Sequence, residues 1–240
     1  MLAALEDPML SLSRPHILVL TGLLGLTFAL GAAIAEAPAA APTKGENVEL
    51  EATVAGIEAR YKLVTDFKAS FAQEVKRAHN PRPKKKSGRV YFKAPGMMRW
   101  DYLSPERVYY ISDGEILWSV EKEQKQVAKL NIKDSDLFDS LKFLFGQGDL
   151  RASFDATFAG HDGDLVGLSL VPKKGQQNFK SLTVWAKKDG YEVVKTVLID
   201  PVDNVSTITF KDLKYDTLKV EGFKYTPDPN FKLLDYTKQK

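Results

Sequence analysis

The sequence has 240 residues and contains no cysteine. This absence excludes disulfides, metal sites built on thiolates, thiol chemistry and a lipid-modified N-terminal cysteine. Histidine is scarce, because the chain has only three, His16, His79 and His161. His161 falls in an expected turn beside Asp162 and Asp164, and a polar turn explains this group better than a weak metal site does.

Known catalytic motifs are missing as well. The sequence has no Gly-x-Ser-x-Gly, no His-Glu-x-x-His and no phosphate-binding glycine loop. Asp134 and Asp136 fit the start of a helix better than an acid–base pair. Because no nucleophile, base and orienting group come together, we expect no enzyme activity, no metal and no cofactor. The alternative is a hydrolase assembled from scattered Ser and Asp residues with His161, and mutation of His161 would test it.

Long apolar runs are absent except for one near the N-terminus, Ile17–Ile34. Arg14 and His16 precede this run, and Ala33-Ile34-Ala35 supplies small residues for cleavage. The pattern is typical of a secretory signal peptide, so we expect residues 1–35 to be removed on export. An uncleaved anchor is the alternative, because about 18 apolar residues could just span a bilayer.

The remaining chain predicts one domain. Residues 36–47 are rich in Pro and Ala and are expected to form a disordered leader, and residues 48–240 are expected to form a single domain. Residues 1–35 carry one Arg against Glu6 and Asp7, so their removal changes the net charge from +3 to +4. A charge this small does not indicate nucleic-acid binding.

What the sequence does have is a series of strand patterns between Ser87 and Val120. Four strands are expected, at Gly88–Lys93, Met97–Leu103, Arg107–Ser112 and Glu115–Glu121. Asp113-Gly114 between the last two is a strong hairpin signal. Two of the strands alternate clearly, and the alternation places six residues on one apolar, aromatic face: Met98, Trp100, Tyr102, Ile116, Trp118 and Val120.

More strands and two helices complete the pattern. Further strands are expected at Asp66–Lys76, Gln126–Ile132, Phe154–Phe158, Leu165–Val171, Ser181–Lys187, Tyr191–Ile199, Val205–Tyr215 and Gly222–Tyr225. One amphipathic helix is expected after an Asn47 cap and a second after a Ser135 cap. The sum is a mainly β fold of about 11 strands in one curled antiparallel sheet. The pattern alone leaves open whether the concave side encloses a ligand cavity or a filled core.

The segment Arg77–Lys86 (RAHNPRPKKK) is basic and interrupted by prolines. We expect a solvated hairpin loop, with contact to anionic lipid headgroups as the alternative. Nucleic-acid binding is disfavoured here, because no aromatic residues are interleaved with the basic ones.

Several motifs occur in order along the chain. They are Phe67–Gln73 (FKASFAQ), Gly88–Phe92 (GRVYF), Pro95–Trp100 (PGMMRW), Pro105, Ser112–Trp118 (SDGEILW) and Phe223–Pro227 (FKYTP). Together they resemble the periplasmic outer-membrane lipoprotein carrier family, LolA, whose first strand has the pattern Phe-x-Ala-x-Phe-x-Gln. The resemblance covers roughly Val48 to Asp235, and the combination is more specific than any single motif.

The resemblance implies an incomplete, strongly curved antiparallel barrel with a helical lid that encloses a hydrophobic cavity. It implies a periplasmic carrier, expected to be a monomer, that binds the acyl chains of lipoproteins. The implied partners are acylated lipoproteins, an inner-membrane lipoprotein-releasing exporter and an outer-membrane acceptor. The alternative within the same fold is a periplasmic binding or sensor protein for another lipid or amphiphile.

By position, the resemblance also implies the acyl-chain site. Its expected cavity and lid residues are Phe67, Phe71, Met98, Trp100, Trp118, Ile57, Tyr61, Leu141 and Leu144. One departure concerns the lid. The best-known members have an Arg directly before the Pro of the Pro-Gly turn, and it ties the lid to the barrel, whereas this chain has Ala94 there. The tie is then lost, replaced by Arg99 or Arg89, or unnecessary.

Overall fold

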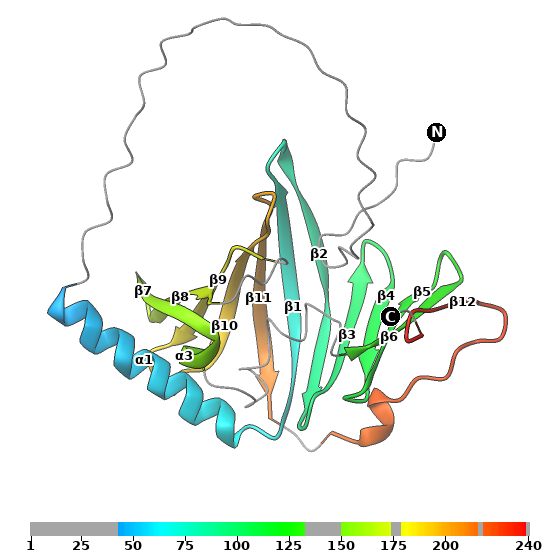
Figure 1. Ribbon diagram of the computed structural model, residues 1–240, viewed down its shortest axis with the longest axis horizontal. Helices are drawn as coiled ribbons and strands as arrows, with labels where there is room; N and C mark the ends of the chain where they lie inside the picture. Colours follow the sequence, from blue (N-terminus) through cyan, green and yellow to red (C-terminus); the bar gives the residue numbers. More distant parts are fainter. Residues whose placement is uncertain (1–42, 133–149, 174–178, 216–217, 239–240) are drawn as a thin grey trace, which may run out of the picture.

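The computed structural model describes residues 43–132, 150–173, 179–215 and 218–238. They form a single 12-stranded curved sheet with one long helix, α1 (Lys44–Leu63), across part of it (Figure 1). The strands are β1 (Asp66–Arg77), β2 (Asn80–Lys93), β3 (Met97–Ser104), β4 (Val108–Ser112), β5 (Ile116–Glu121), β6 (Gln126–Asn131), β7 (Phe154–Asp162), β8 (Leu165–Pro172), β9 (Ser181–Lys187), β10 (Val193–Ile199), β11 (Val205–Lys214) and β12 (Lys232–Asp235). Short helices occur at α3 (Leu150–Ser153) and η3 (Val220–Phe223). The expected mainly β, curved antiparallel fold is confirmed.

The sheet consists of two meanders joined edge to edge. Its order is β12-β6-β5-β4-β3-β2-β1-β11-β10-β9-β8-β7, so β1 to β6 and β7 to β11 each follow the chain. The β1–β11 pairing joins the two halves, for example Phe71 opposite Phe210. All of these pairs are antiparallel, and β12 alone pairs in parallel, with β6. Sequential antiparallel pairing follows from the short turns between neighbouring strands.

Helix α1 starts earlier than expected. Its N-cap is Thr43, whose hydroxyl accepts the Glu46 N–H while the Glu46 carboxylate accepts the Thr43 N–H. This capping box satisfies two amide groups that a helix start leaves free, so the expected Asn47 cap was wrong. The helix packs on β7 and β8. None of the described helices is long and apolar enough to cross a membrane.

The basic segment forms a strand rather than the expected loop. β2 begins at Asn80, and its residues Lys84 to Lys86 pair with Val75 to Gln73 of β1. The prolines at 81 and 83 suggested a break in regular structure. They are compatible with a strand here because β2 pairs with β3 only from Ser87 onward, so this part of β2 is a sheet edge, where a missing N–H is tolerated.

The C-terminal region also differs from expectation. The expected strand Gly222–Tyr225 is replaced by the 3₁₀ helix η3, which packs on β3. The chain then continues to β12, which the sequence did not predict. Phe223 of η3 is 2% exposed. The sheet half formed by β3 to β6 is therefore covered on its convex face as well as its concave face.

Candidate functional site

The structure brings together six of the nine residues expected to form the site, four from the concave face of the sheet and two from α1. Each is less than 9% exposed, and all belong to one hydrophobic cluster: Phe67 and Phe71 of β1, Met98 and Trp100 of β3, and Ile57 and Tyr61 of α1. Leu141 and Leu144 lie outside the described residues, as does the expected helix with its Ser135 cap.

Aromatic rings from three strands touch one another on this face. The Phe71 ring lies 5.0 Å from both the Trp100 and Tyr102 rings, between centroids, and Trp100 lies 6.1 Å from Phe210 of β11. Tilted and edge-on arrangements of this kind are favourable for aromatic pairs. The sheet residues of the site thus belong to a packed aromatic surface rather than to the lining of an open pocket.

Trp118 does not belong to this surface. The register pairs Trp100 with Tyr110 and Tyr110 with Ser119, whereas Trp118 pairs with Ile111. Directly paired residues share a face of a sheet, so Trp118 lies on the convex side. There its ring contacts Tyr225, at 5.5 Å between centroids. Leu117 takes the concave position instead, and it is 2% exposed.

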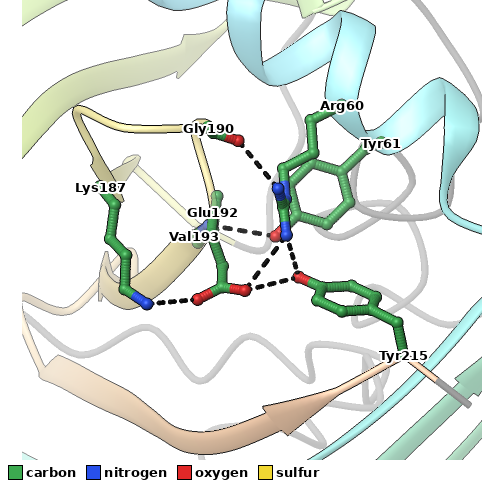
Figure 2. A network of polar contacts seen from close by, with 7 residues as sticks. All are labelled: Arg60, Tyr61, Lys187, Gly190, Glu192, Val193 and Tyr215. Carbon is green, nitrogen blue, oxygen red and sulfur yellow. Dashed lines mark hydrogen bonds and ion pairs between the residues drawn. The ribbon is translucent and has the colours of Figure 1, made fainter.

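Helix α1 is attached to the second meander by a polar network that the sequence did not suggest (Figure 2). Arg60 donates from Nη1 to the Gly190 carbonyl at 3.0 Å, and from Nη2 to Glu192 Oε2 at 3.1 Å and Tyr215 Oη at 2.7 Å. Tyr215 in turn donates to Glu192 Oε2 at 3.0 Å. We call Arg60, Glu192 and Tyr215 the latch. Arg60 and Glu192 are 132 positions apart in the sequence, and Glu192 and Tyr215 are 23 apart, so no local pattern could have identified the latch.

Two further contacts support the latch. Lys187 Nζ lies 2.7 Å from Glu192 Oε1, and the Val193 N–H donates to the Tyr61 hydroxyl at 3.1 Å. Tyr61 therefore contributes its ring to the core and its oxygen to the helix attachment (Figure 2). One end of α1 is thus held by hydrogen bonds to β10 and to the turn before it.

The environment of the latch keeps Glu192 charged. Partial burial would raise the pKa of Glu192, but hydrogen bonds from Lys187 and Tyr215, with the nearby Arg60 charge, outweigh burial and hold the pKa below its ordinary value. Burial raises the pKa of Tyr61 and also that of Tyr215, so both phenols stay protonated at neutral pH.

This arrangement bears on the missing arginine, because the chain has Ala94 where the best-known family members have an Arg. Arg99, one candidate for the missing arginine, binds Asp101 at 2.8 Å and the Gly222 carbonyl at 3.2 Å, away from α1. Arg60 ties the helix to the sheet instead. The arginine is therefore on the helix and its acceptors are on the sheet, the reverse of the arrangement that the resemblance implies.

A pocket of about 670 Å³ lies beside the latch. It opens between the C-terminal half of α1, the start of β1 and the turn before β10. Its lining residues are Gly56, Ala59, Arg60, Leu63, Val64, Thr65, Asp66, Gly190, Tyr191 and Tyr215. Gly56 lets the helix approach closely here, because a Cβ at this position would lie 2.3 Å from the Tyr191 ring. The lining combines apolar residues with the charged Arg60 and Asp66, which suits an amphiphile better than a purely apolar ligand.

His161 contacts an acidic residue of α1. Its Nε2 lies 2.8 Å from Glu49 Oε2, which links β7 to α1, and both side chains are exposed. Within the described residues, no group of three or more His, Asp and Glu side chains is placed to hold a metal ion.

A pH dependence follows from Glu192. Because its folded pKa is lowered, its contribution to stability is complete above the ordinary value of 4.5 and is lost as pH falls through the folded value. We expect Glu192→Gln to destabilise the protein at neutral pH, and the deficit to shrink in acid. Urea unfolding between about pH 7 and about pH 3 measures this difference. The exposed Glu221→Gln should show no such trend, and a deficit for Glu192→Gln that is constant across the range would contradict the assignment.

Comparison with known sequences and structures gives a consistent result. The sequence profile of the family "Outer membrane lipoprotein carrier protein LolA" matches residues 62–226. An outer-membrane lipoprotein carrier protein from Chromobacterium violaceum is 28% identical over 201 residues, which is 82% of this chain and 92% of the relative. A protein of the same name from Dechloromonas aromatica is 26% identical, over 69% of this chain and 79% of the relative.

Solved structures are similar as well. A conserved protein from Thermus thermophilus matches with a TM-score of 0.51 at 13% identity, over 77% of this chain and 98% of that one. A LolA superfamily protein from Nitrosomonas europaea matches with a TM-score of 0.43 at 10% identity, over 73% of this chain and 97% of that one. At such identities the first match supports the curved-sheet fold and nothing more specific.

Proposed function

Because the chain belongs to the outer-membrane lipoprotein carrier (LolA) family, a family of carriers and not of enzymes, we propose that it carries acylated lipoproteins. In this proposal it acts as a monomer in the periplasm after its signal peptide is removed. It receives cargo from an inner-membrane exporter and delivers it to an outer-membrane acceptor. Names of relatives support the cargo class, and the route is inferred from the resemblance.

The observation that carries the proposal is the aromatic concave face of the sheet, together with the α1 residues that join its hydrophobic cluster. Helix α1 packs on β7 and β8, contributes Ile57 and Tyr61 to the cluster, and is held at one end by the latch. In the state described, the helix and the rings occupy the space that acyl chains would need. Loading in this proposal requires α1 to move away from the sheet, so that acyl chains reach the hydrophobic cluster that includes Phe71, Met98 and Trp100.

Apolar contacts of α1 and of an acyl chain have energies of the same order. Val54 and Ile57 of α1 are buried, and burial of such side chains contributes about 1.5–3 kcal/mol each. Burial of an acyl methylene contributes about 0.8 kcal/mol, so about six methylenes offset the loss of both contacts. A carrier with this balance can close without cargo, open with it, and release cargo to an acceptor that binds the acyl chains better.

The position of the acyl chain can be tested with a brominated acyl chain on a lipopeptide, because bromine quenches nearby tryptophan fluorescence. Of the three tryptophans, Trp100 faces the concave side, whereas Trp118 and Trp185 lie on strand positions that alternate with the concave residues. We expect binding of the brominated lipopeptide to quench Trp100.

Two matched variants assign the signal. Trp118→Phe should keep the quenching, and Trp100→Phe should lose it while still binding the lipopeptide. Quenching that disappears in Trp118→Phe instead would place the acyl chain on the convex face. A purified protein that binds no acylated peptide would contradict the carrier role altogether.

A further inference from the structure

The hairpin of β1 and β2 extends well beyond β3, while on its other side β1 pairs with β11 as far as Lys76. Residues 80–86 of β2 pair only with β1, because the β3 pairing begins at Ser87. Figure 1 shows the tip of this hairpin rising past the ends of the neighbouring strands. We call residues 74–89 the basic hairpin. It is a projecting β-arm whose backbone pairing has one irregularity, between Val75 and Arg77.

Positive charge is concentrated in this arm. Residues 74–89 contain seven Lys or Arg side chains and one acid, Glu74, for a net charge of +6. The whole chain has a net charge of +3, so the remainder carries −3. A protein that is slightly acidic elsewhere thus places its excess positive charge at one end. Such a distribution orients the molecule toward an anionic surface.

The charges are accessible and lie on both faces of the arm. Arg82, Lys84 and Lys85 are exposed, and Lys84 and Lys85 point to opposite faces because neighbouring strand residues alternate. Glu74, the one acid within the arm, pairs with Lys76 at 3.5 Å, and two acids in the neighbouring turn before β11 also have partners. Asp203 pairs with Lys180 at 2.6 Å, and Asp200 accepts hydrogen bonds from Asn204.

The arm suits a lipid surface better than a peptide. The prolines at 81 and 83 remove two N–H donors from the edge of β2, so an extended peptide would find an interrupted partner there. Ala78 is the only apolar residue among 76–80, and Ala78 and two prolines are the only ones among 76–86, so no large side chain anchors a protein partner. Charges on two faces of a tip can all approach a plane of headgroups.

We propose that the basic hairpin is an electrostatic arm that docks this protein on anionic lipid headgroups. Each exposed cation near such a surface adds roughly fivefold in affinity. No apolar side chain inserts, so the contact is reversible and sensitive to salt. The pocket and Asp66 lie at the opposite end of β1, roughly 35 Å from the tip at the usual rise per strand residue. Docking by the tip therefore keeps the latch end away from the membrane.

Vesicle sedimentation tests the proposal on the exported protein without cargo, so the outcome is independent of whether it carries acyl chains. Vesicles of phosphatidylethanolamine with phosphatidylglycerol provide the anionic surface, and phosphatidylcholine vesicles provide the neutral one. We expect binding to the anionic vesicles alone, at about 0.01 M salt and not at about 1 M, where the screening length falls from about 30 Å to about 3 Å. The combined Arg82→Gln, Lys84→Gln, Lys85→Gln variant should bind at least about tenfold more weakly.

The control removes three exposed lysines at the other end of the molecule, with Lys188→Gln, Lys219→Gln and Lys224→Gln. It has the same net charge as the first variant and should bind as the wild type does. Equal weakening in both triple variants would show an effect of net charge alone and overturn the proposal. Binding to neutral vesicles or binding that persists at high salt would overturn it too. So would a first variant that aggregates while the wild type binds no vesicles, because the charges would then only protect a sheet edge.

Discussion

Replacement of Arg60 by alanine is expected to increase the affinity of the protein for an acylated lipopeptide. Arg60 makes three hydrogen bonds from α1 to the sheet side, one of them to a carboxylate. Their loss should favour the open state by about 2 kcal/mol or more, which is roughly a 30-fold change in its population. When only the open state binds, the apparent dissociation constant falls by the same factor until the open state predominates. Titration with the brominated lipopeptide measures it.

Three other variants define the effect. Arg60→Lys keeps the charge but not the forked geometry and should be intermediate. Lys62→Ala removes an exposed cation from the same helix and should change nothing. Arg99→Ala breaks contacts to Asp101 and Gly222 on the convex side, so it should leave lipopeptide affinity unchanged. If Arg60→Ala folds normally and binds the lipopeptide no better than the wild type, the latch does not control access to the concave face.

Met98→Glu is expected to have the largest effect on stability. Met98 is fully buried in the concave cluster. A carboxyl group there would have its pKa raised by burial, and a shift of 3–5 units costs about 4–7 kcal/mol once the pH exceeds the folded pKa, of which about 3.5 kcal/mol is already present at pH 7. This is a large part of the stability of a typical domain, about 5–15 kcal/mol. We expect the variant to be mostly unfolded or strongly destabilised at pH 7, as urea unfolding followed by far-UV circular dichroism would show.

The pH dependence separates the charge from the change in shape. A buried Glu with a raised pKa destabilises little below its unfolded value and increasingly above it, so the deficit relative to wild type should grow as pH rises from about 4 to about 8. Met98→Leu conserves volume and should cost less than about 1.5 kcal/mol at every pH. A Met98→Glu protein as stable as the wild type at pH 8 would mean that water reaches this side chain.

Local sequence patterns were sufficient to predict most strands, because alternation and turn residues act over a few positions. They were less reliable where both faces of the sheet are covered. In β5, Ile116, Trp118 and Val120 alternate like a concave set, yet the register places them on the convex side. The C-terminal segment covers that side, and Val120 is 1% exposed there. Hydrophobicity therefore marks both faces of β5, and alternation alone cannot identify the concave one.

The residues of the candidate site were likewise predicted only in part from the sequence. Phe71, Met98 and Trp100 were predicted together because a strand pattern and a family resemblance agreed on them. The latch was missed because Arg60, Glu192 and Tyr215 meet only after the two meanders have paired. Proline composition also misled the interpretation of residues 80–86, since a proline that breaks a central strand is acceptable at an edge.

The connectivity of α1 has a consequence for assembly. The helix directly precedes β1, the first strand of one meander, but it packs on β7 and β8 of the other. Each meander can form from neighbouring hairpins, whereas docking of the helix brings together residues from both meanders, because the helix is attached to β1 and binds β7 and β8. We therefore expect docking of the helix to follow formation of the second meander. Release of the helix alone would therefore leave both meanders formed and would expose the apolar surface of β7 and β8 that the helix covers.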